Sequence, residues 1–317
     1  MKYYFAVGFL ALFAGIFLAS PVLALTISPA KLEITGDPGT TVWEEFELFN
    51  EQQDVKTLYS SFANFDSSGE SGAPHFLPSK DGLASWITTD SKIVLQPDQR
   101  KKISFSIAIP QDAEAGGHFA AIFWGSQPPG SQEGGQVSIG SKLGILVLLK
   151  VSGEVEEGGG LLEFNTASRF FSATPVPFAY RLSNDGGNRM VPHGTITVKN
   201  LFLWKSAEFE ANEKEGSVLP GSTRKFQVAW GQEPEKNPGF FGIALEQLMH
   251  FHLGWYSAHL SLTFGENNQT ASKSFSFFII PWQLLFLVAI VLAIFIFLGT
   301  FGLKRYNRWI ISMASKK

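Results

Sequence analysis

The feature that most constrains this chain is a run of twenty uncharged, mostly apolar residues, Leu284 to Leu303. A helix needs about 20 apolar residues to cross the hydrocarbon core of a bilayer. It also satisfies its own backbone hydrogen bonds there, where no water is available. We therefore predict a membrane-spanning helix over residues 281–303, with Trp282 at interface depth. A buried core helix is the alternative that the length disfavours.

Basic residues follow this run directly, at Lys304, Arg305 and Arg308. Lys and Arg beside a span stay on the cytoplasmic side of the membrane. We therefore expect residues 304–317 to form a basic cytoplasmic tail that is too short to fold. The chain before the span would face outward, which predicts a single-pass protein of the cell membrane whose bulk is extracytoplasmic.

Residues 1–24 have the pattern of an export signal peptide. Lys2 gives the positive start, Phe5 to Leu18 is the apolar core, and Val22 to Ala24 supplies small residues before a cleavage point. An uncleaved anchor is the alternative. Both interpretations place the middle of the chain outside the cytoplasm.

Composition excludes several classes of chemistry. The chain has no cysteine, so disulfides, thiol catalysis and cysteine-ligated zinc are excluded. Its net charge is −3, and without a basic excess we expect no nucleic-acid partner. We also expect no cofactor, and the sequence does not indicate an oligomeric state.

Residues 25–153 read as short β-branched and aromatic runs separated by turn residues. In the clearest run, residues 102–110, apolar residues alternate with small or polar ones, which predicts a half-buried antiparallel strand. Residues 41–49 also alternate, but Trp43 and Phe49 share their side with Glu45 and Glu47. The pattern therefore does not show which side of that strand is buried. Strands at this spacing favour an immunoglobulin-like β-sandwich.

The same pattern recurs over residues 161–278, after a Glu- and Gly-rich linker at residues 154–160. Two short matches connect the halves: residues 95–97 match 219–221, and residues 117–121 match 254–258. Two copies of one sandwich explain these matches, with convergent strand patterning as the alternative. The predicted fold class is all-β, two tandem immunoglobulin-like β-sandwiches followed by one C-terminal transmembrane α-helix.

Four stretches of the outward chain, which are residues 27–29, 86–87, 95–97 and above all 109–122, resemble the WxL-interacting family of bacterial cell-surface proteins. The resemblance implies an export signal, two immunoglobulin-like domains, a transmembrane helix and a short basic tail. It also implies peptidoglycan binding by the first domain and a partner surface protein for the second. A more distant similarity is to periplasmic pilus chaperones, from which the chain departs by its membrane helix and by lacking a match to their basic subunit-anchoring residues.

The sequence points to a contact loop at residues 125–136, because sandwich domains place recognition loops at their ends. A disordered connector is the alternative. A wall polymer or a surface protein would be the partner, and the candidate partner-binding residues are His118, Trp124, Gln127, Gln132 and Gln136. The run 143–149 is apolar on both faces, so we expect a loop, the other domain or a partner's strand to cover its second face.

No catalytic motif is present, so a non-catalytic envelope adaptor is the leading hypothesis. A metal-assisted hydrolase is an alternative, because His250 and His252 would share one face of a strand with His259 nearby. A membrane-tethered chaperone acting by strand addition is the other alternative.

Overall fold

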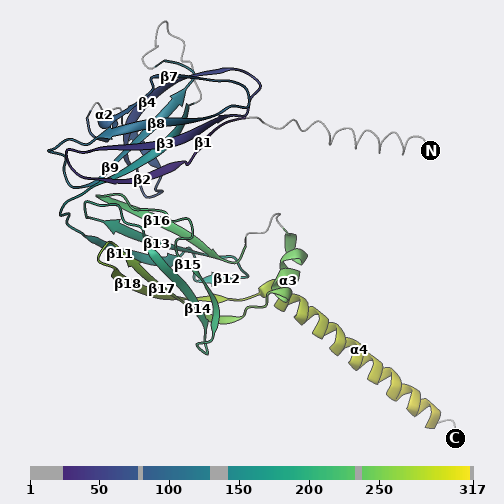
Figure 1. The fold of residues 1–317 in the computed structure, drawn as a ribbon. Coiled ribbons are helices and arrows are strands. Elements are labelled where there is room, and N and C mark those ends of the chain that lie inside the picture. The colour runs from purple at the N-terminus through teal and green to yellow at the C-terminus, as the bar shows by residue number, and fades with distance from the viewer. Residues whose placement is uncertain (1–23, 78–80, 129–141, 233–237, 315–317) are drawn as a thin grey trace, which may run out of the picture. The chain divides into compact units, whose positions relative to one another are not determined.

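The computed structural model describes residues 24–77, 81–128, 142–232 and 238–314. It is predominantly β, with one long C-terminal helix (Figure 1). The export signal predicted over residues 1–24 lies outside the described residues except for Ala24. The chain divides into two compact units: unit 1 contains residues 1–66 and 74–155, and unit 2 contains residues 67–73 and 156–317.

Unit 1 consists of two sheets. One sheet has the strand order β1-β3-β8-β6, and the other has the order β2-β10-β9-β4-β5 with β7 also paired to β4. Its elements are β1 (Leu25–Ser28), β2 (Lys31–Gly36), β3 (Thr41–Asn50), β4 (Lys56–Ser67), β5 (Pro74–Leu77), α2 (Leu83–Trp86), β6 (Ile87–Thr89), β7 (Lys92–Leu95), β8 (Arg100–Ala108), β9 (Gly116–Gly125) and β10 (Lys142–Val151).

Both sheets of unit 1 contribute to a single hydrophobic core, as expected for a two-layer β structure. In β8 the alternation predicted from sequence is confirmed: Ile103, Phe105 and Ile107 are buried while Ser104 is exposed. In β3 the structure resolves the open question, because Phe46 and Leu48 face the core. Between β4 and β6 the chain forms the short strand β5 and the short helix α2.

Unit 2 has sheets of order β11-β13-β16 and β12-β18-β17-β14-β15. Its elements are β11 (Gly159–Thr166), β12 (Phe170–Phe171), β13 (Val176–Asn184), β14 (His193–Asn200), β15 (Lys205–Glu210), β16 (Ser222–Trp230), α3 (Gly239–Met249), β17 (Gly254–Phe264), β18 (Gln269–Ile279) and α4 (Trp282–Ala314). Because β11 begins at Gly159, the predicted linker 154–160 ends inside a strand.

The two units share most of their strand pairing, in the same chain order. In unit 1, β3 pairs with β1 and β8, and in unit 2, β13 pairs with β11 and β16. The closing strands β10 and β18 each pair antiparallel with the strand before them and parallel with a short early strand, β2 or β12. The weak sequence matches between the halves therefore coincide with a shared topology.

A buried asparagine occupies the same place in each unit. Asn50 ends β3 and Asn184 ends β13, and their side chains are 0% and 1% exposed. Each amide nitrogen donates to the carbonyl oxygen four residues later, at 2.8 Å for Asn50 and 2.7 Å for Asn184. Each also reaches the chain ahead of the next paired strand, at Gln96 (3.0 Å) or Val218 (2.9 Å). These bonds satisfy the buried side-chain amide and tie the end of each strand to two neighbouring segments.

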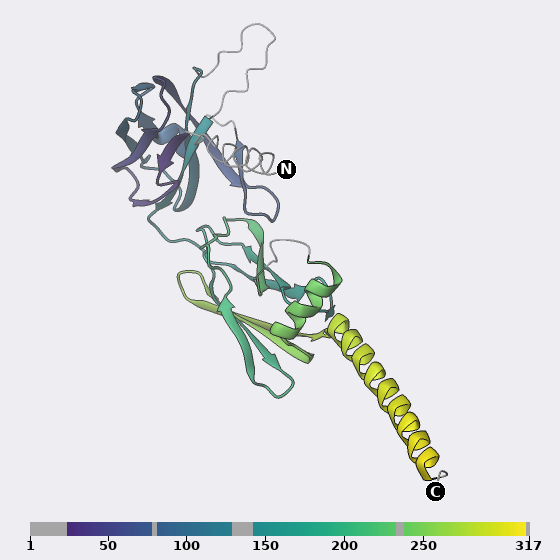
Figure 2. The same ribbon diagram turned by 90° about the vertical axis from the view of Figure 1, so that its right-hand side faces the viewer.

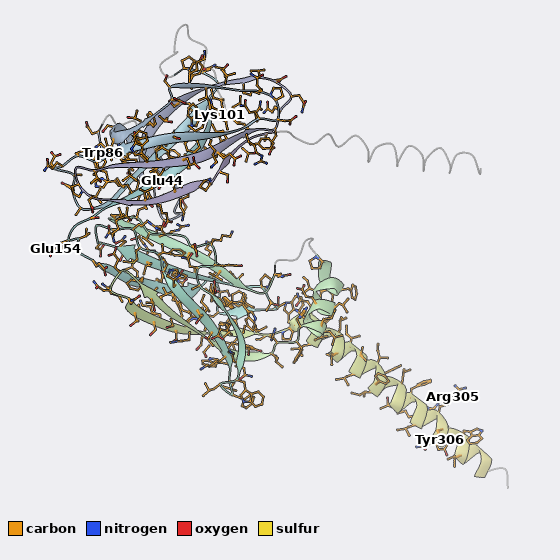
Figure 3. All side chains as sticks on the ribbon, in the orientation of Figure 1. Glu44, Trp86, Lys101, Glu154, Arg305 and Tyr306 are labelled. Carbon is orange, nitrogen blue, oxygen red and sulfur yellow. The ribbon has the colours of Figure 1, made fainter. Side chains whose placement is uncertain are left out.

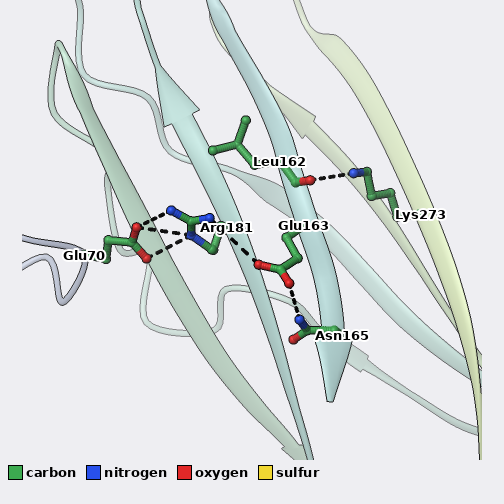
Figure 4. A network of polar contacts seen from close by, with 6 residues as sticks. All are labelled: Glu70, Leu162, Glu163, Asn165, Arg181 and Lys273. Atoms are coloured by element: carbon green, nitrogen blue, oxygen red, sulfur yellow. Dashed lines mark hydrogen bonds and ion pairs between the residues drawn. The ribbon is translucent and has the colours of Figure 1, made fainter. Parts of the chain in front are cut away.

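Residues 67–73 group with unit 2, and Glu70 is bonded within it (Figure 4). Its carboxylate accepts from both Nε and Nη2 of Arg181, with 2.9 Å between Nε and Oε2. The Glu70 carbonyl oxygen accepts from the Lys225 amide at 2.8 Å. Hydrogen bonding to Arg181 lowers the pKa of the Glu70 carboxyl below its ordinary 4.5.

Two helices differ from the predictions of an all-β second domain and an unfolded tail. The sequence reasoning did not predict α3, which lies beside the start of α4 (Figure 2). Helix α4 continues past Leu303 to Ala314, because no helix breaker separates the apolar run from the basic residues. Arg305 and Tyr306 therefore lie on the last turns of the same helix (Figure 3).

We predict that Asn184→Ala destabilises the protein by about 1–3 kcal/mol, the cost of leaving buried backbone partners unsatisfied, and that Asn50→Ala behaves alike. Denaturant unfolding of the full chain in detergent measures the effect. Gln53→Ala, in the exposed turn after Asn50, is the control and should change the free energy of unfolding by less than about 0.5 kcal/mol. Equal effects of all three variants would contradict the proposed role.

We predict that the protection of the Lys225 amide from hydrogen exchange depends on the ionisation of Glu70. A carboxyl whose folded-state pKa is lowered stabilises the fold above its unfolded value and loses that effect as pH falls through the folded value. Protection should therefore be constant above pH 4.5 and fall below it. Glu70→Gln should give low protection without this pH dependence, and an unchanged profile would contradict the prediction.

Candidate binding face of unit 1

The sheet β1-β3-β8-β6 has a core side and an outer side, and the outer side holds the candidate binding face. On β3 the outer residues are Trp43, Glu45, Glu47 and Phe49, which alternate with the buried Phe46 and Leu48. Because side chains of paired residues lie on the same side of a sheet, the strand register identifies their neighbours. We call this surface the Trp43 face.

The indole of Trp43 is the most exposed large apolar side chain among the described residues of unit 1, at 71%. Its register partner on β8 is Ser106, which is paired in turn with Thr88 on β6. Ser104 lies two residues before Ser106 on β8, on the same side of the sheet. Small hydroxyl side chains therefore lie beside a large flat ring that is open to solvent.

Charged side chains continue the Trp43 face along β3 and β8. Lys102 donates to Glu45 at 2.5 Å, and this hydrogen bond raises the pKa of the Lys102 amine. Arg100 lies 3.7 Å from Glu47 and places its guanidinium 4.1 Å from the centre of the Phe49 ring. The face thus has an aromatic end and an end with paired charges.

This arrangement suits a sugar ring. The face of an indole carries partial negative charge and attracts the polarised C–H groups on one side of a pyranose. The hydroxyl rim of the sugar would meet Ser, Thr, Glu and Lys side chains, which both donate and accept hydrogen bonds. These groups stand on sheet strands, so little ordering is needed when a ligand binds.

The structure separates the residues predicted for partner binding. His118 lies on β9, where its Nε2 is 2.9 Å from the Glu114 carbonyl oxygen and its ring is 4.9 Å from that of Trp86. The prediction for Trp124 is wrong: its side chain is 0% exposed and belongs to the core of unit 1. It cannot reach a partner without unfolding the sheet.

Gln127 is exposed and follows β9. Gln132 and Gln136, with most of the predicted contact loop 125–136, lie outside the described residues.

The doubly apolar run 143–149 is the interior strand β10. It is paired along its whole length with β9, and from Leu146 to Val151 with β2, so only residues 142–145 have no paired strand on the second side. Its second face is covered from its own sheet: the ring of Phe123 packs over Gly144, where an added Cβ would lie 2.7 Å from it. Phe76 in turn contacts Phe123, with ring centroids 4.9 Å apart.

The histidines proposed for a metal site do not converge. His250 caps the C-terminal end of α3 instead of lying on a strand. His252 packs its ring 4.7 Å from that of Trp230, and burial lowers its pKa. His259 is exposed on β17, where its Nδ1 lies 2.8 Å from the Ser274 hydroxyl. Within the described ranges, no three His, Asp or Glu side chains are placed to hold a metal ion.

Trp43 was missed by the sequence reasoning because its strand shows no clean apolar side. The usable signal was its position on the same side as Glu45 and Glu47. A tryptophan that alternates in phase with charged residues lies on the solvent side of a strand.

No protein-family model and no curated protein matches the chain. Among solved structures, the class 5 fimbriae chaperone CfaA aligns at 10% identity over 79% of this chain and 98% of its own, with a TM-score of 0.38. The E. coli chaperone DraB aligns at 11% identity over 80% and 97%, and Salmonella enterica SafA pilin in complex with the SafB chaperone at 9% over 82% and 99%, both with TM-scores of 0.36. At these low scores the likenesses assign no function, and the fold rests on the strand pairing given above.

We predict that the two tryptophans differ sharply in their effect on stability. Trp124→Ala should destabilise the protein by about 3–5 kcal/mol, since it removes a fully buried ring. Trp43→Ala should change the free energy of unfolding by less than about 0.5 kcal/mol, since its ring is exposed. Thermal or denaturant unfolding of both variants measures this, and a large loss on Trp43→Ala would mean that Trp43 is structural.

Proposed function

We propose that this protein is a non-catalytic, membrane-anchored adaptor of the cell envelope that binds a carbohydrate wall polymer through the Trp43 face. The observation that carries the proposal is the 71% exposed Trp43 on a rigid sheet among hydroxyl and charged side chains. A single exposed apolar residue is ordinary on a protein surface. The specific argument is the combination of a flat aromatic ring with hydroxyl and charged side chains on the same side of the sheet.

Under this proposal the two units are tandem immunoglobulin-like sandwiches. Their shared strand order and the matched positions of Asn50 and Asn184 support two copies of one fold. Each unit has two sheets in which most neighbouring strands are antiparallel, as is typical of immunoglobulin-like domains.

Helix α4 provides the membrane anchor in this proposal. Residues Trp282–Ile310 form a helix long and apolar enough to cross a membrane, with a mean hydropathy of 3.0 over its best window. Lys304, Arg305 and Arg308 at its C-terminal end favour a cytoplasmic C-terminus, with both units outside. The resemblance to WxL-interacting surface proteins supports the same arrangement and the same class of ligand.

A partner surface protein is the second candidate ligand, because the outer side of the β2-β10-β9-β4-β5 sheet carries an aromatic cluster. Phe65 contacts Phe76 and Phe119 at centroid distances of 6.0 and 5.8 Å. Phe76 is 40% exposed, so the cluster is open to a partner at one edge. Strand addition, as in a chaperone, would find only residues 142–145 of β10 without a partner on the β2 side.

We predict that Trp43→Ala lowers retention of the full chain on purified wall polymer by at least about tenfold, the loss typical of removing a central aromatic contact. Trp43→Tyr should retain most of the binding, because an aromatic face remains. Sedimentation of the detergent-solubilised protein with wall material measures both.

Phe76→Ala is the matched control, since it removes an exposed ring from the other sheet of the same unit. It should leave wall retention unchanged. If Trp43→Ala binds the wall like the parent chain, the Trp43 face is not the wall site. If Phe76→Ala alone loses capture of an envelope protein, the second candidate is correct.

A further inference from the structure

The exposed apolar side chains of unit 2 gather at one end of its larger sheet. The strand register identifies that end: Asn200 at the end of β14 pairs with Tyr256 near the start of β17, and Gly254 pairs with Ile279 at the end of β18. The β14–β15 turn, the α3–β17 connection and the β18–α4 connection therefore lie together. In Figures 1 and 2 this turn and the first turn of α4 both lie in the lower half of the unit.

Helix α3 is fixed against the start of α4 by its inner side. The buried Gln247 donates to Gln283 at 2.6 Å and to the Ser172 carbonyl at 3.0 Å, and it accepts from the Leu284 amide at 2.9 Å. The ring of Phe240 lies 5.8 Å from that of Trp282. The position of α3 is thus set by the element that would enter the membrane.

The opposite side of α3 is apolar and uncovered. Phe241, Leu245, Leu248 and Met249 are 75%, 58%, 61% and 72% exposed, and their spacing places them on one side of the helix. The only charged residue of α3, Glu246, falls outside this side. An apolar side opposite a packed inner side is unusual for a helix bathed in water, which would carry polar residues there.

The β14–β15 turn presents a second exposed apolar group. Leu201, Phe202, Leu203 and Trp204 are 66–74% exposed. The Asn200 side-chain oxygen shapes the turn by accepting from the amides of Phe202 and Trp204, both at 3.0 Å. Leu203 has φ 62°, a backbone conformation in which a bulky residue is rare. The turn therefore keeps an exposed leucine at a position that would favour glycine or asparagine.

Aromatic residues also line the sheet next to this end. Phe170 and Trp255 are 62% and 46% exposed, and their rings lie 5.4 and 4.8 Å from the ring of Phe278 between them. Among the described residues of unit 2 ahead of α4, Leu162 is the one large exposed apolar side chain away from this end. Aromatic residues are enriched where a protein meets the headgroup level of a bilayer.

We propose that this end of unit 2 is a lipid-contact surface. Helix α3 lies along the boundary between headgroups and acyl chains with Phe241, Leu245, Leu248 and Met249 toward the acyl chains, and the tip Leu201–Trp204 inserts beside it. This is how an interfacial helix with one apolar side binds a bilayer. The inference rests on the proposed membrane span of α4, and it adds that unit 2 is seated on the bilayer instead of being tethered above it.

A bilayer is the occupant that the arrangement favours, because the apolar groups surround the point at which the chain begins its membrane helix. The side chains of α4 that follow this point are also apolar and exposed. A second copy of the chain or a partner protein is the competing occupant, and it would shield the same side chains from lipid.

The absence of cysteine in the sequence allows single, uniquely labelled positions. Leu245→Cys and Phe202→Cys, each labelled with an environment-sensitive nitrobenzoxadiazole dye, report on α3 and the tip in the full chain. Leu292→Cys in α4 reports on the span, and Leu162→Cys is the exposed apolar control. Each protein is reconstituted into vesicles of phosphatidylcholine and phosphatidylglycerol carrying a nitroxide either near the carbonyl end or near the methyl end of the acyl chain.

We expect the dyes at 245 and 202 to emit at shorter wavelength and to be quenched by the nitroxide near the carbonyl end. The dye at 292 should be quenched by the nitroxide near the methyl end, and the dye at 162 by neither. Quenching at 292 without quenching at 245 and 202 would overturn the inference and leave the anchor intact. A blue-shifted but unquenched dye at 245 or 202 would overturn it in favour of a protein occupant. No quenching at 292 would remove the membrane span on which the inference rests.

Discussion

The fold depends on burying one side of each sheet against its partner sheet. With no cysteine in the chain, non-covalent contacts hold each unit together, and apolar packing is the main one. The cores achieve this with large apolar side chains such as Phe105 and Phe178, and each contains one buried asparagine that ties a strand end to two neighbouring segments. Side chains on the outer sides of the sheets do not contribute to the core and can serve binding. The Trp43 face lies on one of these outer sides.

Sequence patterning predicts much of this architecture. The alternation around Ile103 and the unbroken apolar run that begins at Leu284 identify a half-buried strand and a long apolar helix, because each follows a single dominant physical rule. The short matches between the halves indicate the repeated topology. The order of strands within each sheet follows from pairing between distant segments, which no local pattern records.

The site was harder to predict for related reasons. Trp124 looked like part of a contact loop because it precedes one, yet strand register turns its ring into the core. Side chains of a strand point alternately to its two sides, and Phe46 and Leu48 point into the core. Trp43, an odd number of residues away from both, therefore points to solvent. Helix α3 escaped prediction because Glu246 and Gln247 are its only polar residues that mark a side, and its inner side is defined by contacts with α4. In each case the decisive information is a contact between segments far apart in sequence.

The central claim, that both units lie outside a membrane that α4 crosses, has one direct test. Single-cysteine variants at Val55, in an exposed turn of unit 1, and at Lys304, at the end of the apolar run, are expressed in intact cells and treated with a membrane-impermeant maleimide. The account predicts labelling at position 55 in intact cells and at position 304 only after the membrane is permeabilised. Labelling at 304 but not at 55 in intact cells would contradict it.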